Sequence, residues 1–205
     1  LARDRDAMAA VAQEFDGYIT DMLNTRRQAG DQAPDDVTTS LMREQVNGKP
    51  MTDDELVSLM RNWTVGELAT ISASVSILLN YLARHPALMA DLKAAPELLP
   101  EAIDEILRMD APLISNRRVT TREVEIGGRT IPAGEKIPLL WASANRDEAE
   151  FGNPDSYCPH QNAGKNLLYG AGIHVCPGAP LARMELQVFM EEFLKQIAAI
   201  DIAKD

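Results

Sequence analysis

The stretch Leu167–Arg183, LLYGAGIHVCPGAPLAR, decides how this sequence is interpreted. Its three glycines, at positions 170, 172 and 178, allow a backbone to turn tightly and to approach a flat ligand closely. Cys176 lies where this loop leads into a helical pattern, and Pro177 suits the first position of a helix. A thiolate at that place meets free amide hydrogens and the positive end of the helix dipole. An iron centre uses such an electron-rich sulfur to promote O–O cleavage.

The same stretch resembles the cysteine signature of the cytochrome P450 family, F-G-x-G-x-H/R-x-C-x-G, in its bacterial form. Tyr169 stands where Phe is usual, and the positions that match are Gly170, Gly172, His174, Cys176 and Gly178. The resemblance implies haem b, with Cys176 as axial iron ligand, His174 at a haem propionate, and Tyr169 and the three glycines around the cofactor. It also implies a mainly α fold with a small β-hairpin or sheet portion, the C-terminal half of the P450 fold. Cys158 is interpreted as a bystander.

A second family motif precedes the cysteine loop. Glu105-Ile106-Leu107-Arg108 matches the family's E-x-x-R, and it is followed by Pro112 and a hairpin pattern, as in the family. Taken alone, opposite charges three residues apart on a helix are usually a surface pair. The family completes this pair with an Arg, and spacing from Tyr169 puts Gln161 at that position. A neutral amide can bond Glu105 but cannot balance its charge.

Arg118 aligns with the family's propionate-binding arginine. A guanidinium suits a carboxylate because its fork of donors pairs with both oxygens. Without the resemblance, Arg118 would be interpreted as an exposed hairpin residue, and Arg117 next to it could exchange roles with it.

The longest helical pattern runs from the capping box that begins at Thr52 to about Arg84, before His85-Pro86. Counted back from Pro86, Thr70 falls on the family's oxygen-activating threonine, and Gly66 falls where a small residue opens a groove for dioxygen. The acid that usually precedes this threonine is replaced by Ala69. We hypothesise that Glu67 supplies the proton-relay acid instead. The alternative is that Thr70 bonds a backbone carbonyl at a local kink and Glu67 is solvated.

Composition excludes several classes of protein. With 31 acidic and 20 basic residues, the formal net charge of −11 disfavours nucleic acid as a partner. The two cysteines form no C-x-x-C pair, which argues against a disulfide scaffold or a cysteine-rich zinc site and favours the cytoplasm. The longest apolar run, Val75–Leu82, is interrupted by polar residues and is shorter than a membrane span, so no membrane is expected. The chain opens with Leu1 and a charged stretch rather than a signal peptide.

Apolar spacing predicts helices up to residue 29, around 37–45, over 52–84, 87–94 and 98–109, and from the cysteine loop onward. Between them, Val124 and Ile126 alternate with polar residues, and Gly127-Gly128 predicts a tight hairpin turn leading to Thr130-Ile131. Residues 141–166 show no sustained period, and long irregular segments of this kind are commonly functional. We expect residues 1–205 to be one domain, the haem-binding half of a P450-like fold that lacks its N-terminal half.

The resemblance implies hydroxylation of a small apolar organic substrate with O₂ and electrons from a reductase or ferredoxin. Ala69 also favours a peroxide-driven variant of the same chemistry. A hypothesis of a different class is a haem-free fragment that acts only as an interaction surface, which Gln161, Ala69 and the missing half favour. Self-association through the surface that the missing half would cover is a further expectation.

Overall fold

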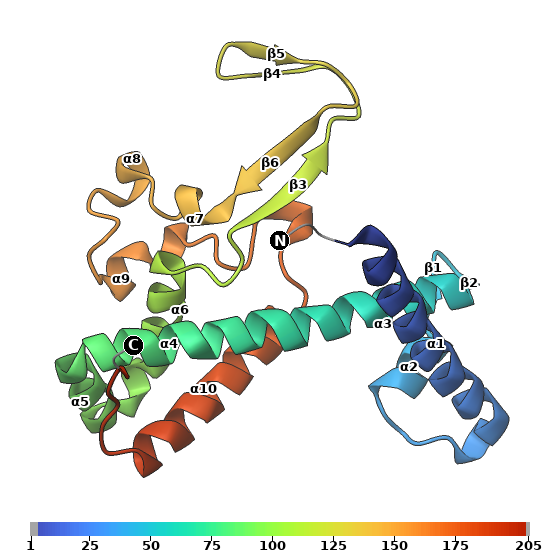
Figure 1. Ribbon diagram of the computed structural model, residues 1–205, viewed down its shortest axis with the longest axis horizontal. Helices are drawn as coiled ribbons and strands as arrows, with labels where there is room; N and C mark the ends of the chain where they lie inside the picture. Colours follow the sequence, from blue (N-terminus) through green and yellow to red (C-terminus); the bar gives the residue numbers. More distant parts are fainter. Residues whose placement is uncertain (1–3, 204–205) are drawn as a thin grey trace. The chain divides into compact units, whose positions relative to one another are not determined.

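The computed structural model describes residues 4–203 and is mainly helical with three small antiparallel sheets, as expected (Figure 1). The chain forms two compact units, Leu1–Leu68 and Ala69–Asp205. Each unit buries apolar side chains of its own, and the two are described separately.

The first unit is built on two helices that pack against each other, α1 and α3. Its elements are α1 (Arg5–Ala29), α2 (Val37–Arg43), β1 (Gln45–Val46), β2 (Lys49–Pro50) and α3 (Asp53–Val65). The small core of this unit is centred on Ile19, Leu23 and Leu56. The predicted capping box is confirmed, because Thr52 and Glu55 each bond the other's backbone amide at the start of α3.

The long helix is unbroken from Asp53 to Arg84, but its middle, Gly66–Ile71, is π-helical before α4 (Ser72–Arg84) begins. By length and composition this helix could cross a membrane, although its longest apolar run, Val75–Leu82, predicted no membrane span. It is the one such helix in residues 4–203. A core helix of a soluble protein passes the same test; α4 buries Leu78 and Leu82 in the core of the second unit, and 17% of the apolar window is buried.

The second unit packs four helices around one apolar core: α4, α5 (Pro86–Ala94), α6 (Leu99–Met109) and α10 (Ala179–Gln196). Helix α6 is the most deeply buried of them, and even its charged residues Glu105 and Arg108 are 2% and 0% exposed. Burial of aliphatic side chains from all four helices holds the cysteine loop, which directly precedes α10, against α6.

Two antiparallel strand pairs form an arm in this unit (Figure 1). The predicted hairpin is confirmed: β4 (Val124–Ile126) pairs with β5 (Arg129–Ile131) across Gly127-Gly128, both at positive φ. The sequence did not predict the second pair, β3 (Ser115–Val119) with β6 (Lys136–Leu140), in which Arg118 lies opposite Ile137. In β3 the half-buried side chains are polar, so hydrophobic alternation gives no signal.

The segment after β6 is largely irregular, as expected, with three four-residue helices: α7 (Trp141–Ala144), α8 (Glu148–Phe151) and α9 (Pro159–Asn162). The last helix begins at Ala179, slightly later than the earliest start expected. Pro180, rather than Pro177, takes the early position that suits proline.

Candidate functional site

The cysteine loop is closed by its own backbone. The Cys176 amide donates to the Tyr169 carbonyl at 2.8 Å, and the Ala179 amide donates to the Cys176 carbonyl at 3.2 Å. Gly170 has φ +78°, and a Cβ there would lie 3.1 Å from the His174 carbonyl oxygen, so this position requires glycine. Gly172 also has a positive φ of +64°. The loop thereby leaves Cys176 as a free, exposed thiol in front of α10.

An open cavity of about 170 Å³ lies between this loop, α6, α10 and the first strand of the arm. Its walls are mostly apolar, including Ile71, Leu107, Leu113, Leu168 and Leu186. Of the residues singled out from the sequence, it brings together Thr70, Arg118, Tyr169, Gly170, His174 and Cys176. Segments from four distant parts of the sequence therefore converge on one apolar site that contains a single thiol.

Tyr169 replaces the expected Phe, and its hydroxyl group has no hydrogen-bond partner among the described residues although it is buried. The Arg183 guanidinium lies 4.4 Å from the centre of the Tyr169 ring and also donates to Asp104 at 2.9 and 3.0 Å. Burial, reinforced by the charges of Asp104 and Cys176, raises the Tyr169 pKa to about 12. The phenol is therefore neutral and remains a donor at neutral pH.

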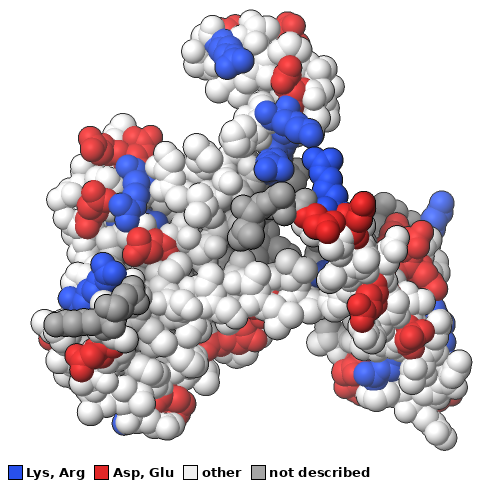
Figure 2. Space-filling model, in the orientation of Figure 1, with Lys and Arg blue, Asp and Glu red and all other residues white. Residues whose placement is uncertain are grey.

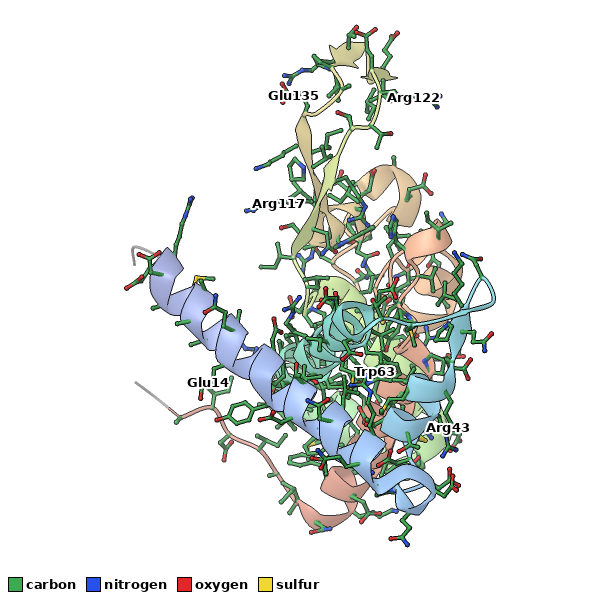
Figure 3. The ribbon with its side chains drawn as sticks, turned by 90° about the vertical axis from the view of Figure 1, so that its right-hand side faces the viewer. Glu14, Arg43, Trp63, Arg117, Arg122 and Glu135 are labelled. Atoms are coloured by element: carbon green, nitrogen blue, oxygen red, sulfur yellow. The ribbon has the colours of Figure 1, made fainter. Side chains whose placement is uncertain are left out.

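Strand alternation separates the two neighbouring arginines. Arg118 is half-buried and lines the cavity, whereas Arg117 is exposed and lies on the other face of β3. Figure 3 shows Arg117 at the outer side of the strand pair, with Arg122 and Glu135 further along the arm. Figure 2 shows Lys and Arg side chains gathered on this arm. Arg118 also donates to the Arg117 carbonyl at 2.9 Å. Of the two, Arg118 is therefore the one placed to bind an anion in the cavity.

The E-x-x-R pair is a buried ion pair rather than a surface pair. Arg108 donates to both oxygens of Glu105, at 2.7 and 2.9 Å, and also to the backbone carbonyls of Asn145 and Pro154, at 2.6 and 2.8 Å. Helix α6 is thus joined to the irregular segment that leads to the cysteine loop.

The prediction that Gln161 completes this pair is wrong. Gln161 is exposed, and the next residue, Asn162, is 2% exposed and donates from Nδ2 to Glu105 Oε1 at 2.7 Å. The backbone amide of Cys158 donates to the same oxygen at 3.0 Å, so Cys158 joins the network through its main chain. Burial alone would raise the Glu105 pKa, but the hydrogen bonds from Arg108, Cys158 and Asn162 outweigh it, and the pKa is lowered.

Thr70 and Glu67 both belong to the π-helical segment. Thr70 lines the cavity, and its carbonyl accepts a hydrogen bond from the Ser74 hydroxyl at 2.7 Å. Glu67 and Gly66 lie in the first unit, whereas Ala69 and Thr70 begin the second, so only the latter two are placed relative to the cavity. π-Helical turns occur frequently at functional sites, and composition gives no signal for them.

Sequence reasoning missed two further polar residues of the cavity, Asn116 and Trp141. The indole N–H of Trp141 donates to Asn116 Oδ1 at 2.6 Å, and both residues line the cavity. Residues two apart on a strand share a face, so a polar residue two positions before Arg118 was the sequence signal for Asn116.

A family model described as Cytochrome P450 matches residues 1–95 and 89–198. Cyclomarin C epoxidase CymV of Salinispora arenicola is 35% identical over 198 residues, which cover 97% of this chain and 49% of that protein. The 20-oxo-5-O-mycaminosyltylactone 23-monooxygenase of Streptomyces fradiae is 41% identical over 119 residues, 58% of this chain and 28% of that protein.

Solved structures give the same result. The ligand-free P450 monooxygenase TamI superposes with a TM-score of 0.86 at 32% identity, covering 100% of this chain and 50% of TamI. CYP108D1 from Novosphingobium aromaticivorans has a TM-score of 0.86 at 31% identity, covering 98% of this chain and 48% of that chain. The chain thus spans about half the length of the relatives that it matches along its whole length.

Proposed function

Because this chain belongs to the cytochrome P450 family, we propose that the protein containing it is a haem-thiolate monooxygenase and that Cys176 binds the haem iron. The observation that carries the proposal is the apolar cavity that gathers Cys176, His174, Arg118 and Thr70 from separate segments. The haem-free fragment considered from the sequence is not favoured, because the relatives of this chain include an epoxidase and a monooxygenase.

The residues of the cavity fit a haem in their chemistry. Cys176 offers one soft thiolate ligand at an apolar wall, as iron in this family requires. His174 and Arg118 supply the basic groups for two carboxylates, and Gly170, which also lines the cavity, has no side chain to occupy it. A Cβ at position 178 would lie 3.8 Å from the Cys176 sulfur, an ordinary van der Waals distance, so this contact does not by itself require glycine there.

A haem bound there would supply oxygen-insertion chemistry, in which O₂, two electrons and two protons place one oxygen atom in a substrate C–H bond and yield one molecule of water. In this proposal Arg118 and His174 would hold the two propionates, and Cys176 would be the electron-rich thiolate ligand of the iron. The apolar walls, with Ile71 and Leu113 among them, exclude water and favour a small apolar organic substrate. Thr70 holds and passes a proton at its hydroxyl oxygen, and Glu67 resupplies it.

The ligand assignment is tested by adding haemin to the chain, reducing it, adding carbon monoxide and recording the absorption spectrum. We expect a strongly red-shifted Soret band from thiolate ligation. The band is expected to vanish in Cys176→Ala and to persist in Cys158→Ala, which changes the other free cysteine. A spectrum that is the same in Cys176→Ala as in the parent chain would refute the assignment.

The role of Glu67 is tested in the intact protein by the ratio of product formed to electrons consumed. We expect a lower ratio in Glu67→Gln, because the amide cannot release a proton. An unchanged ratio would show that Glu67 does not supply the proton.

For the intact protein we also propose electron delivery by a reductase or ferredoxin and a cytoplasmic location, which the two free cysteines suit. Residues 1–205 would form the haem-binding half of its catalytic domain.

Self-association of this chain is proposed through apolar side chains beside the cavity, since Ile173 is 96% exposed and Ile114 67% exposed. Light scattering of Ile173→Ser, compared with the parent chain, tests it; equal apparent masses for both would contradict it.

A further inference from the structure

Asn116 lies on the same face of β3 as Arg118. The two residues are half-buried, and both line the cavity, whereas the residues between and beside them, Ser115, Arg117 and Val119, are exposed. Residues two apart on a strand lie roughly 7 Å from each other along it. One wall of the cavity, formed by β3, therefore carries an amide next to a guanidinium.

Trp141 determines which way the Asn116 amide faces. Its indole N–H, which can only donate, lies 2.6 Å from Asn116 Oδ1. The amide oxygen is thereby occupied, and Nδ2 with its two N–H donors points to the other side of the Cβ–Cγ bond, away from the indole. Trp141 is itself fixed, because it begins α7 directly after β6, and the amide of Ala142 donates to the Ile114 carbonyl at 3.3 Å.

An amide donor and a guanidinium side by side form a binding site for a carboxylate, which has two oxygens and accepts only. The Arg118 guanidinium uses Nη1 for the Arg117 carbonyl, and this contact holds the group along the strand. We propose that Asn116, oriented by Trp141, is a second anchor for the porphyrin carboxylate that Arg118 binds. This inference rests on the proposed function, since it requires a porphyrin in the cavity.

The substitution Asn116→Asp separates this role from simple bracing of β3 against α7. Aspartate keeps the size of the side chain and an oxygen acceptor for the Trp141 N–H, but it replaces the amide donors by a carboxylate. Two probes are titrated and followed by the Soret band: haemin, which has two free carboxylates, and haemin dimethyl ester, in which both are esterified.

We expect Asn116→Asp to weaken haemin binding by about tenfold or more, since a charge-assisted hydrogen bond is replaced by like-charge repulsion. Binding of the dimethyl ester is expected to change by no more than about twofold. Trp141→Phe, which keeps Asn116 but frees its amide to rotate, is expected to weaken haemin binding severalfold and again to spare the ester. If Asn116→Asp does not fold, the comparison of haemin with its dimethyl ester in Trp141→Phe tests the role of Asn116.

The outcomes distinguish this inference from the proposed function. Equal losses for haemin and its ester would show that Asn116 and Trp141 only brace the strand, and would overturn the inference. So would undiminished haemin binding by both variants, even where the parent chain shows the thiolate band of Cys176. A parent chain without that band contradicts the ligand assignment instead.

Discussion

The buried carboxylate of Glu105 makes the clearest quantitative prediction. It is 2% exposed and accepts four hydrogen bonds: two from Arg108, one from the Cys158 amide and one from Asn162 Nδ2 at 2.7 Å. Three of these four fall on the same oxygen, Oε1. Asn162 is the neutral partner in the position where the sequence indicated Gln161.

Asn162→Ala removes one charge-assisted hydrogen bond, for which about 1.5–3 kcal/mol is typical. Because Oε1 keeps two other donors, we expect a loss near the lower end, about 2 kcal/mol in the free energy of unfolding. For a chain of this size such a loss lowers the melting temperature by roughly 4–8 °C. The assay is urea unfolding followed by far-ultraviolet circular dichroism at pH 7, with thermal unfolding as a second measurement.

Gln161→Ala is the matched control, because it removes an exposed amide one residue away. Exposed substitutions of this kind change stability by no more than about 0.5 kcal/mol. If Asn162→Ala and Gln161→Ala cost the same, or if Gln161→Ala costs more, Asn162 is not the residue that stabilises the buried carboxylate.

Three further results are expected. The lowered pKa of Glu105 means that its contribution to stability is complete above its unfolded value of about 4.3 and is lost as the pH falls through the lower folded value. The urea midpoints of the parent and of Asn162→Ala should therefore stay apart above about pH 4.3 and converge only as the pH falls further, and a gap that is constant down to lower pH would contradict this. Tyr169→Phe should raise the free energy of unfolding by about 1 kcal/mol or more, since it deletes a buried hydroxyl without a described partner. A lower urea midpoint in this variant would contradict the prediction. Arg118→Gln should weaken haemin binding about tenfold and Arg117→Gln hardly at all, as titrations of the two variants will show.

The sequence predicted those features that depend on local chemistry. The capping box at Thr52, the turn at Gly127-Gly128 and the glycine-rich loop before α10 each depend on residues within a few positions of one another. Side-chain hydroxyls, missing Cβ atoms and short hydrogen bonds fix these structures wherever they occur.

Contacts between distant segments could not be predicted in the same way. Counting residues from Tyr169 gave Gln161 rather than Asn162, because an irregular segment with short helical turns does not fix which side chain faces α6. The Asn116–Trp141 hydrogen bond joins residues 25 positions apart through the pairing of β3 with β6. The half-buried residues of β3 are polar, so the sequence shows no hydrophobic alternation there and does not predict the register of β3 with β6. Once the register is known, it also separates Arg118 from Arg117.

The π-helical segment alters the reasoning that links Glu67 to Thr70. In an α-helix, three residues turn the chain through about 300°, which brings their side chains near one face. A turn closed by i→i+5 hydrogen bonds holds more residues, so a spacing of three residues covers a smaller part of a turn and no longer indicates a shared face. The spacing of three residues therefore no longer indicates that Glu67 and Thr70 share a face, and substitution of Glu67 is the test of proton transfer to Thr70. Glu67→Gln should accordingly lower the yield of product per electron without abolishing turnover, whereas a loss of all turnover would indicate a structural role in the helix.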